Sequence, residues 1–219
     1  MAYLLYCVTL TSAELIPDLV GVSNQPVEAH DAENLRVYWS EVANPETLAE
    51  APVRRFSEQK FRQVLREIVT RTTPVPFPFP AVVVDLETVD KLVAEQRGYY
   101  VEALNRVADT VQYELTATWS ADEQTDLATP IRGREYLKRR EETEARIAAI
   151  DARLKTVTAG IVREWRSRQD RRNHLWFALI VRDDRERFIA ALRSAGPSEG
   201  VRLRLSGPWP PNEFVGLQR

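Results

Sequence analysis

The apolar residues of this chain fall into short runs typical of strands and longer stripes typical of helices. Residues 111–119 alternate strictly, with Val111, Tyr113 and Leu115 on one face, and they form the clearest predicted strand. The continuous apolar run 175–181 predicts a central strand that is buried on both faces. Further strands are predicted at 3–10, 35–40 and 201–206, and residues 27–30 are candidates to pair before the strand at 35–40.

Four segments carry the spacing of amphipathic helices, and a fifth, shorter one has only a helix-start signal. The helix predicted at 57–70 places its apolar residues three and four apart. Asp85 is a suitable N-cap for a helix that reaches residue 109, and Asn44 followed by Pro45 predicts a shorter helix start. The remaining two helices are predicted at 133–168 and 183–194.

The order of these elements predicts an α+β protein with two domains. From residue 111 onward the order is strand, long helix, strand, helix, strand, which is typical of a ferredoxin-like sandwich with one strand altered or missing. The N-terminal part has strands first and helices afterwards, so we predict a second, smaller α+β unit. We place the N-terminal domain at 1–84 and the C-terminal domain, with its one long helix, at 85–219.

A proline-rich segment ends the predicted N-terminal domain. In residues 74–80 four prolines alternate with Val75, Phe77 and Phe79. Proline lacks a backbone donor and favours an extended neighbour, so this segment is extended and cannot donate ladder hydrogen bonds at every second residue. A linker between domains is one interpretation. We favour a rigid segment with Phe77 and Phe79 packed, because linkers are rarely this aromatic.

The tail, residues 206–215, has the sequence Ser-Gly-Pro-Trp-Pro-Pro-Asn-Glu-Phe-Val. Its prolines exclude a helix or a central strand, and Trp209 and Phe214 favour burial over a disordered end. We therefore predict a stiff extended strap on a folded body, with Trp209 packed against the C-terminal domain. The alternatives are a disordered tail and a ligand for a proline-recognition module. We favour a fold-locking role over contact with a partner.

Composition and charge describe an ordinary globular protein. The 219 residues are 44% hydrophobic and 28% charged, with a net charge of −2, which argues against a general nucleic-acid binder. Residues 131–172 contain 13 basic and 7 acidic residues. We interpret this surplus as a solvated or partner-facing helix. A heptad seam in the same helix, formed by Ile147, Ile150, Leu154, Val157 and Ile161, leaves self-association open.

No constellation for catalysis, metal binding or cofactor binding is visible. Cys7 is the single cysteine and lies in an apolar run, and His30 and His174 have no neighbouring ligand at a useful spacing. No phosphate-binding glycine loop and no nucleophile elbow occur. We therefore predict no catalytic, cofactor or metal residues. The sequence also lacks a signal-peptide pattern and a run long enough to span a membrane, so we expect a cytoplasmic protein.

Four stretches together resemble the gas vesicle accessory protein family GvpL/GvpF. The most specific is Gly-Pro-Trp-Pro-Pro-Asn-Glu-Phe-Val at 207–215, directly after a predicted strand. The others are the opening strand at 3–6, the helical residues 61–65 followed by 74–83, and Gly-Arg-Glu-Tyr-Leu-Lys-Arg-Arg at 133–140. The chain departs from the family at Phe61, where histidine is frequent.

The resemblance implies two α+β domains, of which the C-terminal one is a modified ferredoxin fold. It also implies a non-enzymatic accessory or minor structural protein of gas vesicles, which contacts the hydrophobic shell protein and other accessory proteins. Our candidate residues for partner binding or fold-locking are Trp209, Phe214, Phe77, Phe79, Tyr136, Arg139 and Arg140.

Two other classes of function stay open from the sequence. An RNA- or nucleotide-binding module could use a ferredoxin-like sheet, with Arg202 and Arg204 on the last strand. That strand lacks the aromatic pair on which such sheets stack bases. An enzyme whose site is not visible in the sequence is the second, and a deep polar pocket with converging ionisable groups would indicate it.

Overall fold

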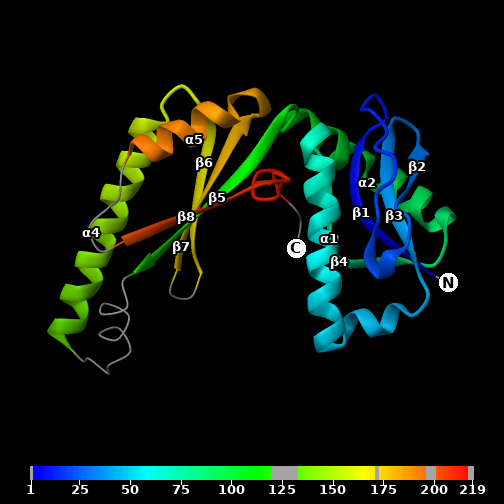
Figure 1. The fold of residues 1–219 in the computed structure, drawn as a ribbon, viewed down its shortest axis with the longest axis horizontal. Helices are drawn as coiled ribbons and strands as arrows, with labels where there is room; N and C mark the ends of the chain where they lie inside the picture. The colour runs from blue at the N-terminus through cyan, green and yellow to red at the C-terminus, as the bar shows by residue number, and fades with distance from the viewer. Residues whose placement is uncertain (1, 120–132, 171–172, 196–200, 217–219) are drawn as a thin grey trace. The chain divides into compact units, whose positions relative to one another are not determined.

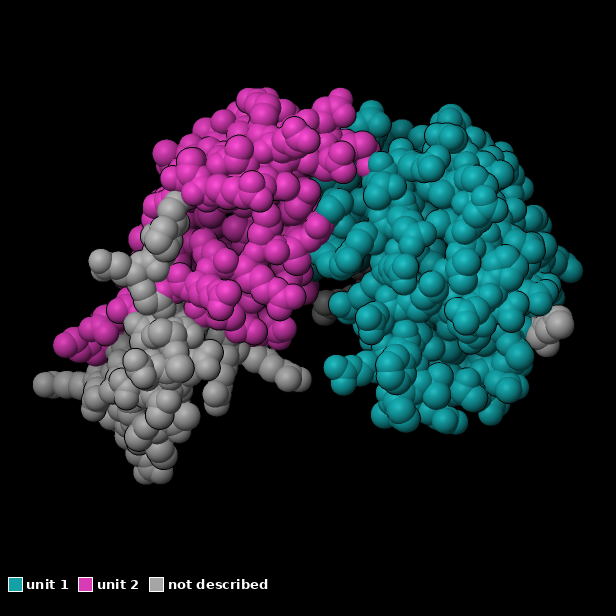
Figure 2. Space-filling view, viewed as in Figure 1, with its two compact units in different colours: residues 1–111, 208–219 teal, residues 112–207 magenta. Residues whose placement is uncertain are grey.

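The chain folds into two compact units (Figure 2). The computed structural model describes residues 2–119, 133–170, 173–195 and 201–216. Unit 1 comprises Met1–Val111 together with Pro208–Arg219, and unit 2 comprises Gln112–Gly207. The boundary that we predict at residues 84 and 85 lies within unit 1. The last residues of the chain, including most of the tail, belong to the same unit as the N-terminus.

Unit 1 is a four-stranded sheet with a long helix on each side (Figure 1). Its sheet has the order β2-β3-β1-β4, and every neighbouring pair is antiparallel. Its elements are β1 (Ala2–Leu10), η1 (Val22–Asn24), β2 (Glu28–Ala32), β3 (Leu35–Val42), η2 (Pro45–Ala49), α1 (Ala51–Arg71), β4 (Val75–Val83) and α2 (Leu86–Arg106). Asp85 caps α2 as predicted, because its carboxylate accepts a hydrogen bond from the Thr88 amide at 2.7 Å.

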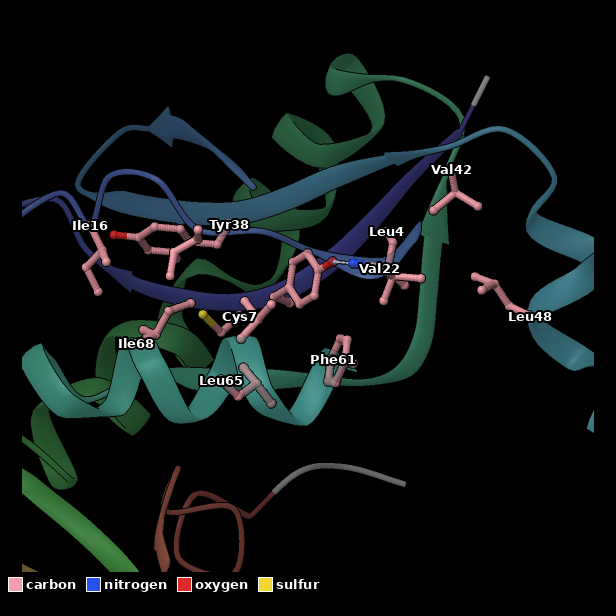
Figure 3. Packing of buried hydrophobic residues seen from close by; sticks show 13 residues of the cluster. Leu4, Cys7, Ile16, Val22, Tyr38, Val42, Leu48, Phe61, Leu65 and Ile68 are labelled. Carbon is pink, nitrogen blue, oxygen red and sulfur yellow. Dashed lines mark hydrogen bonds between the residues drawn. The ribbon is translucent and has the colours of Figure 1, made fainter. Parts of the chain in front are cut away.

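Both faces of the unit 1 sheet are covered, as the burial of neighbouring strand residues shows. Leu4 and Leu5 in β1 point to opposite faces and both are fully buried. On one face, Phe61, Leu65 and Ile68 of α1 pack toward the strands (Figure 3). Helix α2 contributes no residue to that cluster and contacts all four strands, so it covers the other face.

The proline-phenylalanine segment is an edge strand, β4, rather than a linker. In its pairing with β1, Pro76 lies opposite Cys7 and Ala81 lies opposite Leu5. Residues 77–80 of β4 therefore lie outside the regular pairing and form a bulge. An edge position suits prolines, since the side of the strand that faces no neighbour needs no donors. Phe77 and Phe79 are packed, as predicted.

A buried hydroxyl ties three segments of unit 1 together. The Tyr6 side chain is fully buried, and its hydroxyl accepts a hydrogen bond from the Val22 amide at 2.8 Å (Figure 3, dashed line). It also lies 2.8 Å from the Ser40 hydroxyl in β3. This hydroxyl therefore joins β1, β3 and η1.

We expect Tyr6→Phe to destabilise unit 1 by about 1–3 kcal/mol, because it leaves the buried Val22 amide and Ser40 hydroxyl without their partner. Urea unfolding measures the change. The control is Tyr3→Phe, which removes a hydroxyl from a half-buried tyrosine of the same strand and should be nearly neutral. Equal stability of the two variants would contradict this role of Tyr6.

Unit 2 contains four strands, one more than the sequence predicts. Its sheet has the order β6-β7-β5-β8, with β6 and β7 antiparallel (Figure 1). Its elements are β5 (Thr110–Trp119), α4 (Arg134–Val157), β6 (Val162–Asp170), β7 (Asn173–Val181), η3 (Arg182–Asp184), α5 (Arg185–Ser194) and β8 (Val201–Trp209). The chain leaves unit 1 within β5 and returns to it within β8, and these strands are neighbours in one sheet.

The predicted helix at 133–168 is wrong in its C-terminal third. Helix α4 ends at Val157, and Gly160 adopts a φ of +73° that turns the chain back into β6. Strand β6 has no apolar alternation, and it forms because it pairs with β7 from Val162 opposite Ile180 to Asp170 opposite Asn173. Pairing with the strand that follows it in the sequence overrides a local pattern that is compatible with a helix.

The heptad seam of α4 faces the core of its own unit. Ile150 and Leu154 are buried, whereas Ile161 lies beyond the end of the helix. The core also holds Phe188 of α5, whose ring lies 5.3 Å from that of Tyr113 and 6.4 Å from that of Trp165. The seam is therefore used inside unit 2.

Candidate interaction surfaces

The tail closes onto unit 1. Its first residues form the end of β8, and after Pro211 the chain turns tightly, with the Phe214 amide donating to the Pro211 carbonyl at 2.9 Å. Phe214 is fully buried and Val215 is 6% exposed. The Tyr99 hydroxyl of α2 donates to the Val215 carbonyl at 3.3 Å. The tail is thus folded and is not extended throughout.

Trp209 does not pack as predicted. It belongs to unit 1, where the guanidinium of Arg66 in α1 lies 4.4 Å from the centre of its ring. An arginine over a tryptophan face is a favourable cation–π contact. The prediction that Trp209 packs against the C-terminal domain is wrong, because the chain re-enters unit 1 at Pro208, within β8, and Trp209 meets Arg66 of α1.

Phe77 and Phe79 are both packed, on different neighbours. Phe77 is 8% exposed and contacts Tyr100 of α2 edge to face, with ring centres 6.0 Å apart. Burial raises the pKa of Tyr100 to about 12. Phe79 is half-buried and meets the edge of Phe61 at 5.2 Å, and Phe61 in turn stacks on Tyr6 at 5.1 Å. These aromatics connect the edge strand to both helices of unit 1.

The predicted basic element lies on the first half of α4. Arg140 is exposed and pairs with Glu144 one turn later at 2.8 Å. Tyr136 and Arg139 lie on the same helix, but their side chains lie outside the described residues. Of these three residues, Arg140 is therefore the one placed on a described surface.

The single cysteine and the two histidines each have defined neighbours in the structure. Cys7 is fully buried, which raises the pKa of its thiol. His30 meets Asp90 of α2 at 2.7 Å, a pair that the sequence spacing does not indicate. The His174 ring lies 4.3 Å from that of Trp176, and burial lowers its pKa. Among the described residues, no group of three or more His, Cys, Asp or Glu side chains could hold a metal ion.

The sheet of unit 2 offers little to a stacked base. Phe177 of β7 is 2% exposed, and the Arg168 guanidinium covers its ring at 5.0 Å. Arg202 and Arg204 of β8 are exposed, as the alternating pattern of that strand predicts. The arginines are accessible, whereas this aromatic ring is not.

Sequence reasoning missed one exposed surface on α1. The helix begins at Ala51, six residues before the predicted start at Ser57. Phe56 is consequently helical, lies off the buried stripe, and is 73% exposed. The sequence carries one signal for this exposure. Phe56 is the sixth residue of the helix that starts after Pro45 and Glu50, and it does not fit the three- and four-residue spacing of the apolar stripe that includes Phe61 and Leu65.

Comparisons with known proteins agree over nearly the whole chain. Residues 2–216 match the family model described as gas vesicle synthesis protein GvpL/GvpF. The crystal structure of the gas vesicle protein GvpF from Anabaena sp. PCC7120 is similar at a TM-score of 0.77 and 16% identity, covering 100% of this chain and 97% of that one. The crystal structure of GvpF from Microcystis aeruginosa is similar at a TM-score of 0.74 and 17% identity, covering 99% of both chains.

No curated protein matches the sequence. Within the described part of the chain, no helix has the length and apolar character needed to cross a membrane.

Proposed function

Because this chain belongs to the gas vesicle synthesis protein GvpL/GvpF family, we propose that it is a non-enzymatic accessory or minor structural protein that acts in gas vesicle assembly. The observation that carries the proposal is the family match, which extends over residues 2–216 rather than over one unit. The similarity of the fold to two gas vesicle proteins supports it. Its working place is the cytoplasm, in association with gas vesicles.

The proposed activity is protein–protein contact with the hydrophobic shell protein and with other accessory proteins. The candidate residues divide by exposure. Phe214 and Phe77 are buried, which favours fold-locking. Arg140 is exposed, which favours contact with a partner. Trp209 and Phe79 are half-buried and belong to unit 1, where their ring contacts support a mainly structural role.

The architecture that we propose for unit 2 is a modified ferredoxin-like fold. Its elements follow the order strand, helix, strand, strand, helix, strand. In its sheet, β5 and β7 are central, while β6 and β8 form the edges. This succession of elements is the one that characterises the split βαβ motif, and it supports the assignment.

Co-expression tests the function. The tagged chain is expressed with each gas vesicle protein of its own host, and the complexes are purified. We expect it to retain the shell protein or an accessory protein, and we expect loss of its gene to abolish or deform gas vesicles. Intact vesicles in the deletion strain, together with no retained gas vesicle protein, would refute the proposal. A labelled RNA titrated at low salt should give no binding curve.

A further inference from the structure

Phe56 stands out among the apolar side chains of the described surface. At 73% exposed, it is the most exposed large hydrophobic residue that the structure describes. It lies in the first half of α1, on the side away from Phe61 and Leu65, which point into the core. Val53, one turn earlier on the same helix, is 38% exposed and lies next to Phe56, on the side away from Arg62. A single exposed apolar ring is common on protein surfaces, so it indicates an intermolecular contact only together with the charges around it.

A row of arginines lies roughly 80–120° around the axis of α1 from Phe56. Arg55, Arg62 and Arg66 are spaced seven and four residues apart, so they line one face of α1, and all three are exposed. Helix α1 carries six basic and two acidic residues. This face is therefore more basic than the chain as a whole, whose net charge is −2.

Local carboxylates do not neutralise this row. Arg62 pairs with Glu58 at 2.8 Å, but the two side chains are 63% and 38% exposed, and such a pair on a helix surface is weak and exchangeable. Arg55 makes no ion pair among the residues that the structure describes. At the far end, Arg66 is held over the ring of Trp209. The row thus presents at least one guanidinium without an ion pair among the described residues, about 100° around the helix from the exposed ring of Phe56.

We propose that this face of α1, defined by Arg55, Phe56, Arg62 and Arg66 and called here the α1 face, binds an acidic amphipathic helix of a partner protein. Charge complementarity selects an acidic occupant, and Phe56 selects one with an apolar stripe beside its carboxylates. The inference rests on the proposed function, which supplies the class of partner: a protein of the gas vesicle.

The dimensions of the α1 face describe its occupant. From Phe56 to Arg66 the helix rises about 15 Å, which matches roughly three turns of a partner helix. Arg55 and Arg62 are about 10 Å apart along the axis, so carboxylates seven residues apart on the partner would meet both. A contact of this size is small, which favours a transient complex during assembly.

The test uses the full chain and three charge or polarity variants. Wild type, Phe56→Ser, Arg55→Glu and the double variant are co-expressed with each tagged gas vesicle protein of the host, and the affinity for every protein that wild type retains is measured. We expect each single variant to weaken binding of at least one partner about tenfold or more. We also expect wild-type binding to weaken as salt is raised.

Two matched controls separate the α1 face from general surface effects. Leu15→Ser removes another apolar side chain, 52% exposed, from a loop of the same unit. Arg163→Glu makes the same charge change on the exposed surface of β6. Both should bind as wild type does. All variants change exposed residues, so their melting temperatures should stay close to that of wild type.

The outcomes distinguish this inference from the proposed function. Failure of the wild-type chain to retain any gas vesicle protein contradicts both. If wild type retains a gas vesicle protein and Phe56→Ser and Arg55→Glu bind that protein equally well, the role of the α1 face is refuted. The proposed function is not affected by that result. Overlapping peptides of a retained partner then identify the bound segment. Binding confined to a segment without carboxylates also overturns the inference.

Discussion

Replacing Phe214 with alanine should destabilise unit 1 by about 3–5 kcal/mol. Phe214 is fully buried although only five residues of the sequence follow it. The substitution removes a whole ring from a site bounded by the tight turn after Pro211 and by the Tyr99 contact to Val215. Its cost is the lost burial together with the cavity that remains. Urea unfolding, followed by the fluorescence of the tryptophans, measures the change.

Asn212→Ala is the control for Phe214→Ala, because Asn212 is exposed in the same turn. Its effect should stay within about 0.5 kcal/mol. A Phe214→Ala protein as stable as this control would show that the tail does not lock unit 1. If the Phe214→Ala protein remains fully folded but no longer binds a partner, the role of Phe214 is recognition and not fold-locking.

Replacing Gly207 with alanine should destabilise unit 2 by about 3 kcal/mol. Gly207 has a φ of +134°, a conformation that side chains rarely adopt. An added Cβ would also lie 2.9 Å from the Tyr113 ring and 3.0 Å from the Gln112 carbonyl oxygen. The oxygen belongs to the backbone of the neighbouring strand and cannot move aside without disturbing β5. Thermal unfolding of the variant measures the loss.

Gly98→Ala is the control for Gly207→Ala, and its expected change in stability has the opposite sign. Gly98 lies inside α2, where an added Cβ meets nothing within 4 Å. Alanine there should stabilise the helix by about 0.5–1 kcal/mol, since it lowers the entropy of the unfolded chain. If both alanine variants changed stability in the same direction, the close approach of Gly207 to β5 would not be the cause.

Most elements of this protein could be predicted from local pattern. The strand at 111–119, the Asp85-capped helix and the apolar run at 175–181 all appear within a few residues of their expected bounds. The packed proline-phenylalanine segment could also be predicted, because proline excludes other structures there. These segments share strong short-range signals that agree with their final environment.

The candidate surfaces were harder to predict than the elements. Trp209 and Phe214 are visible as aromatics that need burial, but their neighbours Arg66 and Tyr99 are distant in sequence. The position of Phe56 depends on where α1 begins, and helix starts are poorly defined when the N-cap makes no side-chain hydrogen bond, as at Glu50.

The sequence by itself determined the strands and helices with clear periodicity, the stiffness of the two proline segments and, through the tail motif, the family. Tertiary structure alone decided that residues 162–170 form a strand, because β6 has no apolar alternation and owes its conformation to pairing with β7. It also decided that the tail returns to unit 1. A proline-rich segment specifies its own extended shape, whereas the surface that buries its aromatics is created only when α1 and α2 have packed.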